Sequence, residues 1–172
     1  FRSNWDKVHS IGDGIKKILN FNKKTAILLP LHKNPKVREP LKKIFDSHER
    51  AFLVEPLDYQ DLVKAIKICK IVLTDSGGLQ EEAPSLGKPV LVLRDSTERP
   101  EAISSGTAKL VGTDSESIFN NCNLLLTNEN EYKKMAKSGF DWLAVDLEHS
   151  VITIKEAEEL IRVISMGGIS PL

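Results

Sequence analysis

Residues 71–86 read IVLTDSGGLQEEAPSL, and this stretch is the most informative part of the chain for its fold. Its apolar start predicts a short buried strand, and its end predicts a short helix. At the turn between them, Gly77 and Gly78 lack a Cβ atom, so backbone N–H groups can approach a bound group closely. A helix N-terminus favours an anion by about 0.3–1 kcal/mol, and Ser76 adds a hydroxyl. The pattern indicates a phosphate-binding turn, although a tight turn with an N-cap serine has the same residues.

The remainder of the chain repeats this alternation of strand and helix. Strands are predicted at residues 25–31, 51–54, 71–74, 89–93 and 108–111. Helices are predicted at residues 5–19, 36–45, 58–68, 79–86, 115–126 and 129–137. Gly12 and Gly14 weaken the first helix, Pro40 favours a shorter second helix, and Asp58 is a plausible N-cap of the third. This order predicts an α/β fold in which a parallel sheet has helices on both faces. Strands such as 25–31 are then expected to be buried on both sides. Ligands are expected at the carboxyl ends of the strands.

The composition argues against several classes of partner. The 172 residues include 24 Lys and Arg and 24 Asp and Glu, so the zero net charge argues against nucleic acid or a membrane surface. No apolar run reaches the roughly 18 residues of a membrane span, and no signal peptide is recognisable. Cys69 and Cys122 lack metal-ligand spacing and are expected to be buried thiols in a reducing compartment, the cytoplasm. The length favours one domain, and the start at Phe1 suggests a piece of a longer chain.

Polar side chains follow two other predicted strands. Arg94 and Arg99 follow the fourth strand, where a guanidinium fork can bind a diphosphate, although a surface Arg–Glu pair is the alternative. His32 follows the first strand beside a proline-bounded turn, and this position at the carboxyl end of the sheet favours contact with a ligand. Glu82 lies early in the helix after the glycine turn. Its carboxylate can accept two hydrogen bonds from a ribose, or simply complement the helix dipole.

Together these loops resemble the UDP-N-acetylglucosamine 2-epimerases that do not hydrolyse their product. The matching stretches, in the same order and spacing, are residues 30–35, 56–59, 74–84, 87–91, 94–101 and 106–114. The resemblance covers residues 1–135. It implies the C-terminal, nucleotide-binding half of a fold with two Rossmann-like domains, similar to that of the two-domain glycosyltransferases.

The resemblance also implies a binding site for UDP. It assigns the diphosphate to Ser76, Gly77, Gly78 and Arg99, the ribose to Glu82, the border of the uracil to Leu57 and Leu62, and the substrate face to His32. Leu62 stands where the family often has an aromatic residue. Phe1 stands where the histidine of a His-Arg motif would be, whereas Arg2 matches that motif.

The reaction that the resemblance implies interconverts UDP-N-acetylglucosamine and UDP-N-acetylmannosamine, a step of nucleotide-sugar metabolism that supplies polysaccharide biosynthesis. The family eliminates UDP to a 2-acetamidoglucal and adds it back with inverted stereochemistry. Its proton-transfer carboxylates lie in the N-terminal domain, so we expect no catalytic residue, cofactor or metal site here, and no turnover by this chain alone. An N-terminal domain in another chain, or a homodimer, is the implied partner. The alternatives are a non-catalytic UDP-binding fragment and the C-terminal donor-binding half of a related glycosyltransferase.

Residues 136–172 do not fit the epimerase pattern. Residues 136–150 instead resemble the first strand and loop of metal-dependent class II aldolases of the HpcH/HpaI type, with His149 at the position of the catalytic histidine. The chain ends before the arginine and the acidic metal ligands of that family. Because one strand-helix unit cannot close a barrel, we expect no chemistry from Asp146, Glu148 and His149.

Overall fold

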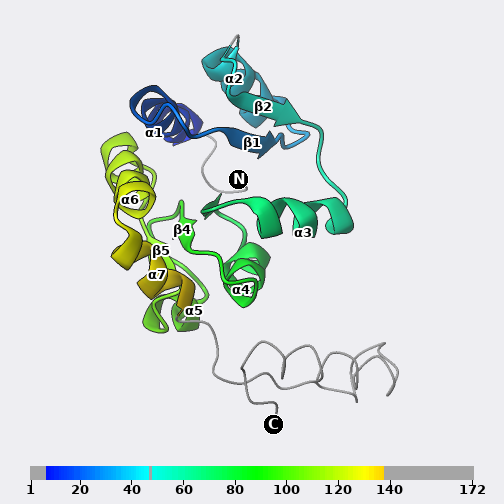
Figure 1. Ribbon diagram of the computed structural model, residues 1–172. Coiled ribbons are helices and arrows are strands. Elements are labelled where there is room, and N and C mark those ends of the chain that lie inside the picture. Colours follow the sequence, from blue (N-terminus) through cyan, green and yellow to red (C-terminus); the bar gives the residue numbers. More distant parts are fainter. Residues whose placement is uncertain (1–6, 47, 138–172) are drawn as a thin grey trace, which may run out of the picture. The chain divides into compact units, whose positions relative to one another are not determined.

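The computed structural model describes residues 7–46 and 48–137, and it has the predicted alternation of strands and helices (Figure 1). The helices are α1 (Val8–Phe21), α2 (Pro35–Phe45), α3 (Tyr59–Ile68), α4 (Gly77–Ser85), α5 (Pro100–Ser104), α6 (Ser115–Thr127) and α7 (Glu129–Lys137). The strands are β1 (Ile27–Pro30), β2 (Ala51–Val54), β3 (Val72–Thr74), β4 (Val90–Val92) and β5 (Ala108–Leu110). The predicted α/β class is confirmed, and no described helix is long and apolar enough to cross a membrane.

All strand pairs in the described part of the chain are parallel, but these strands form two sheets. β1 pairs with β2, and the second sheet has the order β3-β4-β5. Apolar side chains join the two sheets. One core cluster contains Leu91 of β4, and Leu29 of β1, Leu53 of β2 and Leu73 of β3 pack against it. The sheets therefore share a core although no described hydrogen bond pairs β1 with β3.

Burial on both faces is confirmed for β4 but not for β1. The three residues of β4 are each 0% exposed. Exposure alternates along β1, and Leu28 of β1 and Phe52 of β2 remain 47% and 55% exposed. The prediction that residues 25–31 are buried on both faces is therefore wrong. The side chains of α1 and α2 cover one face, and among the described residues the other face remains largely open.

Caps, glycines and prolines explain several helix boundaries. Asp58 caps α3 as predicted, since its side chain accepts a hydrogen bond from the Asp61 N–H at 2.8 Å. α2 keeps its full length with Pro40 inside it, so the expected shortening does not occur. α4 begins at Gly77, two residues before the predicted start, because the glycines form its first turn. The five-residue α5 was not predicted, and it starts at Pro100, whose ring suits the first position of a helix.

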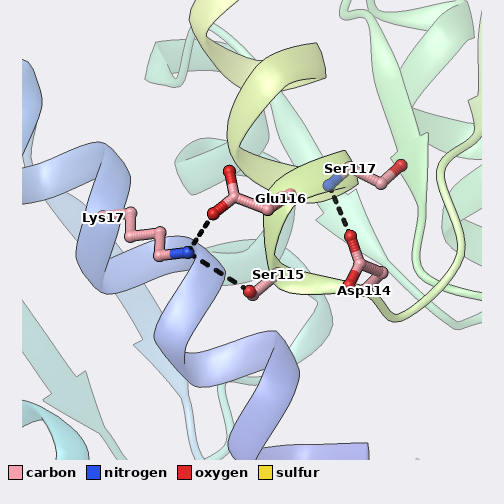
Figure 2. Close-up of polar contacts among 5 residues, drawn as sticks. All are labelled: Lys17, Asp114, Ser115, Glu116 and Ser117. Carbon is pink, nitrogen blue, oxygen red and sulfur yellow. Dashed lines mark hydrogen bonds and ion pairs between the residues drawn. The ribbon is translucent and has the colours of Figure 1, made fainter.

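The glycines of α1 allow close packing against two other helices. Gly12 and Gly14 are both buried, and a Cβ atom on Gly14 would lie 2.9 Å from the Ser115 carbonyl oxygen at the start of α6. Figure 2 shows the polar contacts at this junction: the Lys17 ammonium of α1 reaches the Ser115 hydroxyl and the Glu116 carboxylate. These glycines reduce helix propensity, but they permit an approach that a side chain would prevent.

Both cysteines are free thiols, as expected from the sequence, but of the two only Cys122 is fully buried. Cys122 of α6 is buried in the hydrophobic core, and burial raises the pKa of its thiol to about 12. Cys69 is half-buried. Burial raises the pKa of this thiol as well, although the nearby Lys88 acts in the opposite direction. Both side chains are therefore neutral near pH 7 and behave as small apolar groups.

We predict that Gly14→Ala lowers the free energy of unfolding by about 1–3 kcal/mol, because the new methyl group meets backbone that cannot move aside. Gly12→Ala is the matched control. Its Cβ atom would lie 2.6 Å from the Cδ1 atom of Ile44, the end of a flexible side chain, and alanine gains up to about 1 kcal/mol in helix propensity. Urea unfolding of the two variants measures the difference. Equal stability would contradict a close approach of α1 to the Ser115 backbone.

Candidate functional site

The parallel register of β3 and β4 places two predicted loops next to each other. Thr74 at the end of β3 lies opposite Val92 at the end of β4, and the Leu93 N–H donates to the Thr74 carbonyl at 2.9 Å. The chain then leaves β3 into the α4 turn and leaves β4 into the loop that carries Arg94 and Arg99. The two regions that were predicted to bind phosphate therefore start at the same edge of one sheet.

The α4 turn presents polar groups to open space. Ser76 is the N-cap residue of α4, but its exposed hydroxyl makes no capping hydrogen bond with the described residues. The loop is instead held by the Ser76 N–H, which donates to the Thr74 hydroxyl at 3.0 Å. The Ser76 hydroxyl and the first N–H groups of the helix are thus available to an anion.

The two glycines of the turn have different surroundings. A Cβ atom added to Gly77 would meet no heavy atom within 4 Å. A Cβ atom added to Gly78 would lie 3.6 Å from a carboxylate oxygen of Glu82 and 4.0 Å from the Ser76 hydroxyl. The hydroxyl and the carboxylate are therefore both close to Gly78, beside open space at Gly77. This arrangement suits a ligand that has both phosphate and sugar hydroxyl groups.

Arg99 reaches the first turns of α4 through an ion pair. Its Nε atom pairs with the Glu81 carboxylate, and the two side chains are 45% and 58% exposed. An exposed pair of this kind contributes little stability, about 0–1 kcal/mol. It nevertheless places a guanidinium beside the α4 turn. The predicted alternatives for Arg99, an ion pair with glutamate and a phosphate ligand, are thus compatible.

Arg94 occupies a more enclosed position on the same loop. It is half-buried, and its Nε atom is buried without a hydrogen-bond partner among the described residues. A buried guanidinium N–H without an acceptor is costly. Because Arg94 lies on the same loop as Arg99, it adds a second cation at this edge of the sheet.

A buried hydrogen-bonded link that the sequence did not reveal connects the two loops. Gln80 is 0% exposed, and its amide NH₂ donates to the Ser76 carbonyl at 3.2 Å. Its amide oxygen accepts a hydrogen bond from the Thr97 hydroxyl at 2.6 Å. The sequence shows a polar residue at this helix position, but only the structure shows that it is buried.

The other predicted ligand residues lie on separate segments. His32 is exposed between β1 and α2, and its Nδ1 atom accepts a hydrogen bond from the Asn34 N–H at 3.0 Å. Leu57 is half-buried in the connection between β2 and α3. Leu62 of α3 packs in the same apolar cluster as Ala83 of α4, which links α3 to the helix of the glycine turn. Among the described residues, no group of three His, Cys, Asp or Glu side chains could hold a metal ion.

The comparisons with known proteins point to one family. Residues 2–143 match the family model described as UDP-N-acetylglucosamine 2-epimerase. The chain is 48% identical over 128 residues to the UDP-N-acetylglucosamine 2-epimerase of Salmonella typhimurium, a match that covers 74% of this chain and 34% of that protein.

Solved structures agree with this match. The fold is similar to that of a putative UDP-N-acetylglucosamine 2-epimerase from Listeria monocytogenes, with a TM-score of 0.78 and 42% identity over 80% of this chain and 37% of that one. It is also similar to the Neisseria meningitidis UDP-GlcNAc 2-epimerase bound to UDP-GlcNAc, with a TM-score of 0.75 and 37% identity over 94% of this chain and 41% of that one. Compared with the curated Salmonella relative, this chain spans about a third of the full length.

Proposed function

The chain belongs to the UDP-N-acetylglucosamine 2-epimerase family, and we propose on that basis that it binds the UDP part of UDP-N-acetylglucosamine. In this proposal the chain is the nucleotide-binding half of an enzyme that forms UDP-N-acetylmannosamine. The observation that carries the proposal is the α4 turn, where the Ser76 hydroxyl and the Glu82 carboxylate lie near Gly78 and open space lies beside Gly77. The Neisseria relative bound to UDP-GlcNAc supports the choice of ligand.

The diphosphate is assigned to the α4 turn and to Arg99. Ser76, Gly77 and Gly78 offer a hydroxyl and helix N-terminal N–H groups, and the Glu81 ion pair keeps the Arg99 guanidinium beside them. Donors and a cation at one helix N-terminus favour a dianionic group over a neutral one. The local charge thus fits a diphosphate although the chain as a whole has zero net charge.

The other parts of UDP-N-acetylglucosamine are assigned to neighbouring residues. Glu82 accepts hydrogen bonds from the ribose hydroxyls, because its carboxylate lies close to Gly78. Leu57 and Leu62 border the uracil, with Leu62 packed in the apolar cluster that includes Ala83 of α4. His32 faces the substrate from the loop after β1.

This half of the enzyme would assist the departure of UDP. When the bond between C1 of the sugar and the diphosphate breaks, negative charge grows on the phosphate oxygens. Preorganised N–H groups of α4 and the Arg99 guanidinium would stabilise that charge. The carboxylates that move the C2 proton lie in the N-terminal part of the complete enzyme, so a partner domain in another chain, or a second copy, completes the site.

The domain assignment and the cellular location belong to the same proposal. We assign residues 1–135 to the nucleotide-binding domain, although the family match runs to residue 143 and α7 runs to Lys137. We propose that residues 136–172 are an aldolase-like segment without chemistry of its own, and nearly all of this segment lies outside the described residues. The two free thiols and the zero net charge are consistent with a cytoplasmic protein that does not bind nucleic acid.

UDP binding depends on Arg99 in this proposal. We expect the wild-type chain to give a calorimetric signal with UDP, and Arg99→Ala to weaken the affinity by about tenfold to a hundredfold, because a hydrogen-bonded charge contact is lost. Gly77→Ala fills the open space with a methyl group and is expected to weaken UDP binding without lowering the unfolding midpoint. Lys109→Ala, which removes an exposed cation on β5, is the control. If the wild-type chain gives no calorimetric signal with UDP, the proposal is wrong.

The ribose assignment can be tested by the ligand. The wild-type chain is expected to bind UDP more tightly than 2′-deoxy-UDP, because Glu82 loses a hydroxyl partner in the deoxy ligand. In Glu82→Gln the affinity for UDP falls and the discrimination between the two ligands shrinks by several-fold. Calorimetry on both proteins measures the four affinities. Unchanged discrimination in the variant would exclude Glu82 as the ribose acceptor.

Turnover is expected only with a complementary domain. We predict no interconversion of the C2 epimers by this chain alone, and measurable interconversion after addition of the separately produced N-terminal domain of the Salmonella relative. The Arg99→Ala chain with the same domain should restore less activity. UDP binding without restored activity favours the non-catalytic fragment, and sugar transfer from UDP-N-acetylglucosamine to an acceptor favours the glycosyltransferase half.

A further inference from the structure

The buried Gln80 side chain joins the α4 turn to the loop between β4 and α5. This side chain is 0% exposed although Gln80 stands in the first turns of α4, between the exposed residues of the glycine turn and Glu81. Burial of an amide is unfavourable unless its polar atoms have partners. Both ends of this amide have them: the Ser76 carbonyl accepts from its NH₂ group, and the Thr97 hydroxyl donates to its oxygen.

Thr97 extends this link to Arg99. The Thr97 oxygen accepts a hydrogen bond from the Arg99 backbone N–H at 3.1 Å, so its own proton is free to point at the Gln80 oxygen at 2.6 Å. All three hydrogen bonds run in one direction, from Arg99 through Thr97 and Gln80 to the Ser76 carbonyl. Such aligned bonds polarise one another and strengthen the whole chain.

We propose that Gln80 and Thr97 are positioning residues for the diphosphate site, which hold the Arg99 backbone at a set distance from the Ser76 turn. The inference rests on the proposed function, since the diphosphate is the group that Ser76 and Arg99 would share. Gln80 and Thr97 themselves do not touch the ligand. They act through Arg99, whose own side chain meets α4 through an exposed ion pair with Glu81.

The mechanism is a restriction of the loop between β4 and α5. An exposed ion pair contributes little and weakens with salt. A buried amide with both ends bonded resists displacement, because moving Thr97 leaves the oxygen of the fully buried Gln80 side chain without a partner. The link therefore sets the position of Arg99 before any ligand arrives, which lowers the ordering cost of binding.

The test combines two substitutions in a thermodynamic cycle. Thr97→Val keeps the shape of the side chain and removes the hydroxyl, and we expect UDP affinity to fall by about fivefold to tenfold in calorimetry. In the Arg99→Ala background the same Thr97→Val substitution is expected to change UDP affinity by less than about twofold, because a residue that acts through Arg99 has nothing left to position. Thr97→Ser keeps the hydroxyl and should restore wild-type affinity.

A ligand-free measurement and a control separate positioning from stability. Amide exchange followed by NMR should be faster for the Arg99 N–H in Thr97→Val, while the amides of α4 remain protected. Thr107→Val is the matched control. It removes a buried hydroxyl that donates to the Ala102 carbonyl at 3.1 Å near α5, and it should lower stability without changing UDP affinity.

The possible results separate the positioning role of Thr97 from the proposed binding of UDP. If the wild-type chain binds UDP and Thr97→Val binds it equally well, the positioning role is wrong and the proposed function stands. An equal loss of affinity in the Arg99 and Arg99→Ala backgrounds also overturns the inference, since Thr97 would then not act through Arg99. If the wild-type chain does not bind UDP, the proposed function and the inference both fail, and the exchange data show only whether the link orders the loop.

Discussion

The parallel register between β3 and β4 is the constraint that determines the candidate site. It sets Thr74 opposite Val92, so the chain leaves both strands at the same edge. β4 is 0% exposed at all three residues. Burial of an apolar side chain of this size contributes about 1.5–3 kcal/mol, which exceeds the contribution of any exposed ion pair in the loops. The apolar core therefore determines where the loops begin, and the polar contacts adjust only the path of each loop beyond its strand.

Two kinds of polar contact then act on the loops. The Arg99–Glu81 pair is exposed and contributes little to stability, so Arg99 can give up this partner for a ligand. The Gln80–Thr97 hydrogen bond is part-buried at 2.6 Å, and loss of one partner would leave a polar atom of the fully buried Gln80 unsatisfied. The site thus combines a cation that is free to exchange partners with a buried link that resists change.

In the proposed function, the described residues provide a binding surface for one side of a nucleotide sugar. The α4 turn contributes donors, Arg99 contributes positive charge, and Glu82 contributes an acceptor. These groups suit binding and stabilisation of a leaving diphosphate, but they do not move a proton at carbon. The chain spans about a third of the Salmonella relative, so the remaining groups of the proposed reaction belong to the other parts of the complete enzyme.

The order and type of most secondary structure elements could be predicted from the sequence, because apolar periodicity is a local property. The glycine turn could be identified in the same way, since strand-to-helix turns with two glycines are recognisable without tertiary contacts. The short α5 was missed, because five residues are too few to show a period.

Three features depend on the tertiary structure alone. The close approach of α1 to α6 explains Gly14, whose place in a helix looked unfavourable from the sequence. The open face of β1 depends on which helices cover it, and alternating exposure there does not follow from an apolar run. The Gln80–Thr97 link joins residues 17 positions apart. No local pattern predicts that pairing, because it exists only where the register of two strands brings their loops together.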